Sequence, residues 1–272
     1  MDLTTHADST RDRCFRFYSK ASRQIAPGLE YAQSIYERVL SDAVRTRERW
    51  LDVGCGHQVL PAWRASEEVR LTRSVRRAVG VDYDHLSLRQ HATIRHRVRA
   101  DIETLPFRDG SFDLVTANMV LEHVAKPHRL VTEICRILEP GGLFLAHTPN
   151  VSGYITVMAR MVPESVRPRL AGWLHNRPEA DVFPTHYRIN SETALRRTGT
   201  EAGFSRVTVR YLVSDAQLVM LPPLAVLELF AIRMLMTRPL RLLRPYLIAM
   251  MEKPGGDVRR AAATTAAVPG RA

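Results

Sequence analysis

Two acidic residues stand beside glycines at positions where a bound ligand could reach them. Asp52 lies inside Leu51-Asp52-Val53-Gly54-Cys55-Gly56, and Asp82 follows the apolar run Ala78-Val79-Gly80-Val81. Glycines directly after a strand let the backbone approach a ligand closely, because no Cβ intervenes. A carboxylate inside the loop suits a ligand with an ammonium group, and one at the end of the next strand can accept hydrogen bonds from a ribose diol. The pattern predicts a pocket for a cationic nucleoside.

Strands and helices alternate along the chain in the way that would position such a pocket. Helical periodicity is clear from Pro127 to Leu138, and Glu139-Pro140-Gly141-Gly142 is expected to stop that helix and turn the chain. The alternation predicts an α/β fold with a mostly parallel sheet and helices on both faces. Apolar runs predict strands at residues 50–53, 78–81, 112–117, 142–147, 207–212 and 246–251, with a weaker strand near 97–100.

Four segments resemble, in order and spacing, the successive motifs of class I methyltransferases that use S-adenosylmethionine. They are LDVGCG, VGVDYD, ADIETLPFRDGSFDLVTANMVLEHV and ILEPGGLFLAHTPN, with weaker similarity in FPTHYRINS and EAGF. The likeness is to the broad small-molecule branch called methyltransferase type 11. It implies a Rossmann-like, seven-stranded sheet and S-adenosyl-L-methionine as the cofactor. The residues agree, because an acidic loop that faces a cationic ligand with a ribose describes this cofactor better than a dinucleotide.

The resemblance also implies which residues hold the cofactor. Asp52 would lie near the methionine end with Gly54 and Gly56, and Asn118 would lie beside the same moiety. Asp82 would bind the ribose hydroxyls. The implied set is Asp52, Gly54, Gly56, Asp82, Tyr83, Asp101, Ile102 and Asn118.

The adenine end falls on three of these residues. Tyr83 would flank the ring, Asp101 would accept the exocyclic amine, and Ile102 would pack against the base or donate its backbone N–H. The loop itself departs from the family pattern, because His57-Gln58 stands where a third small residue is usual. Either the loop is wider here or Gln58 touches the cofactor.

Histidines are the candidates for contact with the methyl acceptor. Methyl transfer from a sulfonium mainly needs alignment, and a general base is needed only where the acceptor must lose a proton. His123 follows the fourth strand and could be that base, or it could brace the next helix. His186, beside Tyr187, lies in a segment expected to cover the acceptor, whereas His147 could point into packing. We therefore assign His123 and His186 as the catalytic candidates and expect no metal.

The charge of the chain does not by itself indicate a nucleic-acid partner. The net charge is +11, but only three of the 39 basic residues are lysines. This arginine bias is simply explained by a high-GC genome, whereas nucleic-acid binding needs charge clustered on one face. Asn118-Met119-Val120-Leu121 also lacks the Pro-Pro-aromatic element with which nucleobase methyltransferases hold a flat amine. We expect a small-molecule acceptor and no nucleic acid.

Cysteine use and the N-terminus indicate a cytoplasmic protein. Three cysteines without paired or metal-binding spacing fit a reducing compartment. The polar start of the chain has no apolar core of a signal peptide.

Two segments that interrupt the core pattern, 151–190 and 213–245, are expected to define the acceptor. The second is a hydrophobic helical insertion before the last strand, in which only Glu228 and Arg233 are charged between residues 218 and 236. Pro222-Pro223 and these charges argue against a membrane-spanning helix. The segment could be a lid, a dimer contact, or an interfacial helix that makes peripheral contact with an anionic membrane. All these readings favour an apolar acceptor such as a lipid, quinone, polyketide or lipid-linked sugar.

These patterns predict a helical cap at 1–49, a methyltransferase domain at 50–253 and a disordered tail at 254–272. Two other functions would make different demands on these residues. A nicotinamide-dependent oxidoreductase would need G-x-G-x-x-G, but Val59 stands at the third glycine position. A non-catalytic relative could keep the same fold as a binding module.

Overall fold

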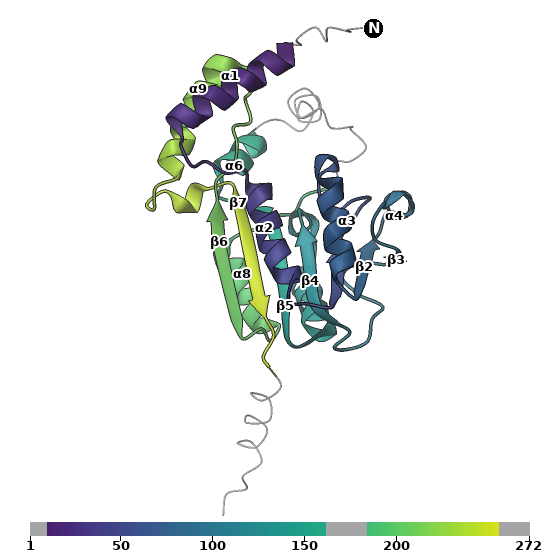
Figure 1. Cartoon of the computed structure of the whole chain (residues 1–272). Coiled ribbons are helices and arrows are strands. Elements are labelled where there is room, and N and C mark those ends of the chain that lie inside the picture. Colours follow the sequence, from purple (N-terminus) through teal and green to yellow (C-terminus); the bar gives the residue numbers. More distant parts are fainter. Residues whose placement is uncertain (1–9, 162–183, 256–272) are drawn as a thin grey trace, which may run out of the picture. The chain divides into compact units, whose positions relative to one another are not determined.

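A seven-stranded sheet in the order β3-β2-β1-β4-β5-β7-β6 organises the chain (Figure 1). The computed structural model describes residues 10–161 and 184–255. Strands β1 to β5 pair in parallel, as a β-α-β alternation requires. The strands are β1 (Arg49–Val53), β2 (Arg77–Asp82), β3 (His96–Arg99), β4 (Phe112–Asn118), β5 (Leu138–Pro149), β6 (Arg206–Leu212) and β7 (Tyr246–Glu252).

Strand β7 runs against its neighbours. The Lys253 N–H donates to the Gly142 carbonyl at 2.9 Å, so the end of β7 lies beside the start of β5. The Ser205 N–H donates to the Glu252 carbonyl at 2.9 Å, so the end of β7 also lies beside the start of β6. The arrows of β6 and β7 accordingly point in opposite directions in Figure 1. The predicted mostly parallel sheet is confirmed, with β7 as the antiparallel strand.

Helices cover both faces of this sheet, as the sequence predicts. Helices α2 and α3 lie in front of the sheet in Figure 1, and α8 lies behind it. On α5 the residues Leu130, Val131 and Ile134 are buried, which confirms the predicted apolar face. The helices are α1 (Thr10–Ile25), α2 (Ala32–Val44), α3 (Ala65–Ser74), α4 (His85–Gln90), α5 (Pro127–Ile137), α6 (Tyr154–Met161), α8 (Glu192–Glu201) and α9 (Pro222–Leu235), and the short 3-10 helices are η1 (Ala62–Arg64), η2 (Leu121–His123) and η4 (Arg241–Leu243).

The predicted end of the helix before Glu139-Pro140-Gly141-Gly142 is confirmed, but the predicted turn at these residues is wrong. Helix α5 ends at Ile137, and β5 continues from Leu138 without a break. Phe112 pairs with Leu138 while Leu114 pairs with Leu143, so β5 accommodates extra residues between the two pairs. Gly141 has a φ of 79°, and a Cβ on Gly142 would lie 2.9 Å from the Glu139 carbonyl oxygen. The glycine pair therefore makes a bulge inside a strand.

The contacts of the chain divide it into two compact units. The sheet unit contains the described residues of 36–151, 184–210 and 247–255. The helical unit contains those of 10–35, 152–161 and 211–246. All predicted cofactor residues and both catalytic candidates belong to the sheet unit. The cap, domain and tail boundaries expected from the sequence follow another criterion and stay predictions, and most of the expected tail lies outside the described residues.

Helix α9 is the hydrophobic helix expected before the last strand. Pro222 and Pro223 stand at its first positions, where the missing N–H would have no intrahelical partner. Within residues 10–161 and 184–255, every helix is too short or too polar to cross a bilayer. Of the other expected insertion, 151–190, residues 162–183 lie outside the described ranges.

Candidate functional site

The predicted cofactor residues meet at one edge of the sheet. Val53 at the end of β1 pairs with Val81 on β2 and with Ala117 on β4. Asp82 at the end of β2 pairs with Arg99 on β3. The carboxyl ends of four parallel strands therefore lie together, which is the edge where ligands bind in sheets of this kind. Every predicted cofactor residue is in, or within a few residues of, one of these strand ends.

The two glycines of the first loop have different surroundings. Gly54 and Gly56 have φ values of 67° and 53°, in the region that favours glycine. The Gly54 N–H donates to the Val81 carbonyl at 2.8 Å, and a Cβ on Gly54 would lie 2.5 Å from Cγ2 of Val120. A Cβ on Gly56 would meet no atom within 4 Å. Gly54 is thus required by packing, whereas the space beside Gly56 is open to a ligand.

Asp82 connects this loop to the second strand. Its Oδ2 accepts a hydrogen bond from the Gly56 N–H at 2.8 Å, and its Oδ1 accepts one from the Asp84 N–H at 2.8 Å. Each carboxylate oxygen has a second acceptor position. The side chain can therefore hold the loop and accept hydrogen bonds from a diol at the same time.

Asp52 is a buried carboxylate with few hydrogen bonds. It is 4% exposed and accepts a hydrogen bond from the Thr116 hydroxyl at 2.5 Å. Burial raises the pKa of Asp52 to about 7, the Thr116 hydrogen bond opposes this, and the charges of Glu68 and Asp82 raise the pKa further. The ionised form is therefore costly, and a cation beside it would relieve that cost.

Tyr36 and His147 form a buried stack next to Asp52, which the sequence did not predict. The ring of Tyr36 stacks on His147 with centroids 5.3 Å apart and an interplanar angle of 19°. The buried Tyr36 hydroxyl has no hydrogen-bond partner of normal geometry among the described residues, and burial together with the Asp52 charge raises its pKa. Burial lowers the pKa of His147 to about 4, and its Nδ1 lies 2.9 Å from Oδ1 of Asn118. His147 is therefore a neutral packing residue near Asn118.

The residues assigned to the adenine lie further out on the same edge. The Arg99 guanidinium covers one face of the exposed Tyr83 ring, 5.3 Å from its centroid. Asp101 is exposed, and its Oδ1 accepts a hydrogen bond from the Glu103 N–H at 2.8 Å. Ile102 is half-buried. Arg99 thus covers one face of the Tyr83 ring and leaves the other, and a local turn orients the Asp101 carboxylate.

Glu68 on α3 holds the loop after the glycines, and no pattern in the sequence predicts this role. This carboxylate is 2% exposed and accepts hydrogen bonds from the N–H groups of Val59 at 3.0 Å and Leu60 at 2.8 Å. The Thr93 hydroxyl donates to its other oxygen. His57-Gln58 is exposed between Gly56, whose N–H is bonded to Asp82, and Val59, whose N–H is bonded to Glu68. The unusual dipeptide therefore lies in a loop that carboxylates fix on both sides.

Both catalytic candidates lie around η2. Nδ1 of His123 lies 2.9 Å from the carbonyl oxygen of Pro184. The His186 N–H donates to the Glu122 carbonyl at 2.7 Å. Backbone contacts thus bring the two histidines, which are 63 positions apart in the chain, to the same part of the sheet unit.

Glu122 supports this segment from inside. It is 4% exposed, and the Thr148 hydroxyl donates to its Oε2 at 3.1 Å. The Asn190 amide in turn donates to the Thr148 hydroxyl at 2.6 Å. Val120, directly before η2, is the residue that fills the space over Gly54. The segment that carries His123 is therefore built against the glycine loop.

A cavity of about 500 Å³ lies away from this edge, at the amino ends of β2 and β3. Its lining includes Arg73, Arg76, Arg77, Arg95 and His96. None of the predicted site residues lines it.

Comparison with known proteins gives the family. A family model described as a methyltransferase domain matches residues 22–209. The chain belongs to this methyltransferase family. A probable S-adenosylmethionine-dependent methyltransferase of Mycolicibacterium smegmatis is 40% identical over 80 residues, which are 28% of this chain and 30% of that protein. A ubiquinone biosynthesis O-methyltransferase of Xanthomonas oryzae is 32% identical over 146 residues, 47% of this chain and 61% of the relative.

The chain thus spans between about a third and three fifths of the length of these curated relatives.

Solved structures share the fold of this methyltransferase. An S-adenosylmethionine-dependent methyltransferase of Mesorhizobium loti superposes with a TM-score of 0.53 at 20% identity, covering 80% of this chain and 96% of the other. One from Listeria monocytogenes gives 0.52 at 14% identity, with 81% and 96% covered. The α/β, Rossmann-like fold is confirmed.

The cofactor of this methyltransferase family is S-adenosyl-L-methionine, and the residues present fit it. The open space at Gly56 admits a ligand to the backbone. The raised pKa of Asp52, about 7, identifies a carboxylate that a positive charge would stabilise. Both features agree with a cationic nucleoside and lie on the same edge.

Proposed function

We propose that this methyltransferase transfers a methyl group from S-adenosylmethionine to a small, apolar acceptor. The observation that carries the proposal is a pair of neighbouring carboxylates: Asp82 accepts a hydrogen bond from the Gly56 N–H, and its charge acts on the buried Asp52. Asp82 would accept hydrogen bonds from the ribose hydroxyls, and Asp52 would face the positive charge of the methionine end. Asn118, held by His147, would lie beside the same moiety.

The adenine would lie beyond Asp82. Arg99 covers one face of Tyr83, 5.3 Å from the ring centroid, and this leaves the other face for a base. Asp101 would accept the exocyclic amine, and Ile102 would pack against the ring. These assignments follow the family pattern and the common edge on which the residues lie.

His123 would receive a proton from the acceptor. When bound, S-adenosylmethionine supplies a methyl group that its positively charged sulfur has already activated. A carbonyl oxygen can only accept a hydrogen bond, so the contact with Pro184 assigns the proton of neutral His123 to Nδ1. Nε2 then carries the lone pair that can take a proton. A Glu122 carboxylate oxygen lies 3.9 Å from Nε2 and would stabilise the charged imidazolium.

An acceptor hydroxyl is the case that this arrangement favours, because a hydroxyl must lose its proton when it is methylated. His186 would contact the acceptor from the segment that is bonded to η2. The Xanthomonas relative is named for O-methylation in ubiquinone biosynthesis, which supports an apolar acceptor with a hydroxyl group.

The first test is ligand binding. Calorimetry should show that S-adenosylmethionine binds and that NADH does not. Asp82→Ala should weaken binding at least about a hundredfold, since two charge-assisted hydrogen bonds are removed. Failure of the wild-type protein to bind, or unchanged affinity in Asp82→Ala with the fold intact by circular dichroism, would sink the proposal.

The second test is transfer. The enzyme is incubated with methyl-labelled S-adenosylmethionine and with separate lipid, aqueous and nucleic-acid extracts of cells. Label is expected in the lipid extract, and His123→Gln should slow its appearance about a hundredfold with unchanged cofactor affinity. Binding without transfer to any extract would identify a non-catalytic binding module, and label in nucleic acid would overturn the proposed acceptor class.

A further inference from the structure

Helix α9 exposes a row of large apolar side chains. Leu224, Leu227, Phe230 and Met234 are between 44% and 67% exposed and recur at steps of three and four residues, so they share one side of the helix. We call these four residues the apolar stripe. A helix of a water-soluble domain normally carries polar residues on its outward side. Packing within the helical unit therefore does not explain why the exposed positions of the stripe are apolar.

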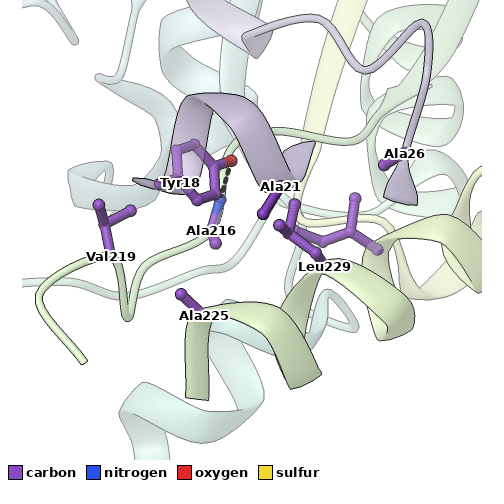
Figure 2. Packing of buried hydrophobic residues seen from close by; sticks show 8 residues of the cluster. Tyr18, Ala21, Ala26, Ala216, Val219, Ala225 and Leu229 are labelled. Atoms are coloured by element: carbon purple, nitrogen blue, oxygen red, sulfur yellow. Dashed lines mark hydrogen bonds between the residues drawn. The ribbon is translucent and has the colours of Figure 1, made fainter. Parts of the chain in front are cut away.

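The opposite side of α9 supplies that packing. Ala225, Leu229 and Ile232 are buried against Tyr18 and Ala21 of α1, and Figure 2 shows this cluster between the two helices. Helix α9 is thus apolar on both sides, and only one of them is used within the helical unit.

The carboxylate of α9 does not reach the stripe. Glu228 accepts hydrogen bonds from the Tyr154 hydroxyl at 3.0 Å and from the N–H groups of Gln217 and Leu218 at 2.9 Å. Asp215 is likewise turned inward and accepts a hydrogen bond from the Tyr18 hydroxyl at 3.1 Å. Both carboxylates are used as internal acceptors.

The outward charges of the helical unit are mainly positive. Among its described residues, Asp12 and Glu30 are the exposed carboxylates. The apolar side chains also continue past α9, because Arg244 bonds the Leu235 carbonyl and so ties η4, with its exposed Leu242 and Leu243, to the helix end. Exposed basic side chains flank the stripe and its continuation at Arg233, Arg238 and Arg241, and they line α1 at Arg11, Arg13, Arg16, Lys20 and Arg23.

We propose that the apolar stripe and the arginines beside it dock this protein onto an anionic phospholipid surface. Apolar side chains next to arginines bind such a surface by inserting below the headgroups while the guanidinium groups contact the phosphates. A second copy of the chain would present the same cations and repel them, whereas anionic lipid complements them. Docking of this kind does not depend on methyl transfer. It would bring an apolar acceptor within reach of the protein.

The test is flotation of the full chain with phosphatidylcholine vesicles, with and without phosphatidylglycerol. Binding is expected to be at least about tenfold stronger to the anionic vesicles and to weaken as salt is added. Leu227→Asp should reduce binding at least about tenfold, because it places a charge in the stripe. Its matched control is Leu86→Asp in the sheet unit, since the two leucines are 67% and 66% exposed.

A second pair of variants separates local docking from overall charge. Arg238→Glu lies beside the stripe, and Arg76→Glu changes the net charge equally from the sheet unit. Only Arg238→Glu should weaken binding clearly. Equal losses in both members of either pair, or no binding of the wild-type protein, would overturn the proposal. So would a dimer in sedimentation analysis that Leu227→Asp dissociates, because the stripe would then be a contact between copies.

Discussion

The cofactor edge of the sheet unit and the α9 core of the helical unit both turn carboxylates inward, but Asp52 is buried and Glu228 is half-buried. Glu228 accepts hydrogen bonds from a hydroxyl and two backbone N–H groups, and so replaces the water it lost with fixed donors. Asp52 has the Thr116 hydroxyl alone as its hydrogen-bond donor among the described residues, and its pKa is raised to about 7. A half-buried carboxylate with three hydrogen-bond donors stabilises the fold, whereas a buried carboxylate with one donor marks a place where a cationic ligand gains free energy.

The glycine loop repeats this contrast within six residues. Gly54 is enclosed by Val120, and Gly56 borders open space. One glycine is needed for the folded chain itself, and the other leaves room for a ligand. Three predictions test these distinctions.

The largest effect is expected from Gly54→Ala. The new Cβ would lie 2.5 Å from Val120 at a φ of 67°, so overpacking and backbone strain add, and the free energy of unfolding should fall by about 3 kcal/mol. Gly56→Ala should lower it by only about 1 kcal/mol, because only the backbone conformation is unfavourable, yet it should weaken S-adenosylmethionine binding about tenfold. Urea unfolding and calorimetry measure both quantities. Equal losses of stability would contradict the assigned difference.

Glu228→Ala should lower the free energy of unfolding by about 2 kcal/mol, since it leaves three donors without their acceptor. Glu228→Gln keeps a carbonyl acceptor and is the matched control, with a smaller expected loss. Cofactor affinity should be unchanged in both variants. A selective loss of affinity would show that α9 takes part in cofactor binding and would remove the contrast with Asp52.

Asp52→Asn should instead raise the free energy of unfolding at alkaline pH. The folded-state pKa of about 7 lies above the ordinary value of 3.8, so the folded protein binds more protons between these values and wild-type stability falls as pH rises through them. Asparagine removes this dependence, and its advantage should grow from pH 5 to pH 8 to about 1–2 kcal/mol. S-adenosylmethionine affinity should fall about tenfold at pH 8. Parallel stability curves for the two proteins would refute a costly charge on Asp52.

Much of the site could be predicted because its residues follow strand ends. Asp52, Asp82 and Asp101 each stand near an apolar run, and parallel strands necessarily bring their carboxyl ends to one edge. Tyr36, Glu68 and Glu122 could not be predicted in this way. They act through contacts with distant backbone or rings, and a helical position shows nothing of the partner that its side chain will meet. The sequence predicts a turn where the structure has a bulge at Gly141 and Gly142 for a related reason. Glycines serve both structures, and only the pairing of β4 with β5 distinguishes them.

The sequence alone determined the α/β class, the order of strands along the chain and the identity of the donor, because these depend on local periodicity and on motifs a few residues long. Tertiary structure decided which carboxylates are costly and which are structural, since that depends on the number of donors that packing supplies. It also decided what α9 does with its apolar surface. Composition showed a hydrophobic segment, but only the packing of one side against α1 reveals that the other side, with Leu227 and Phe230, is left exposed.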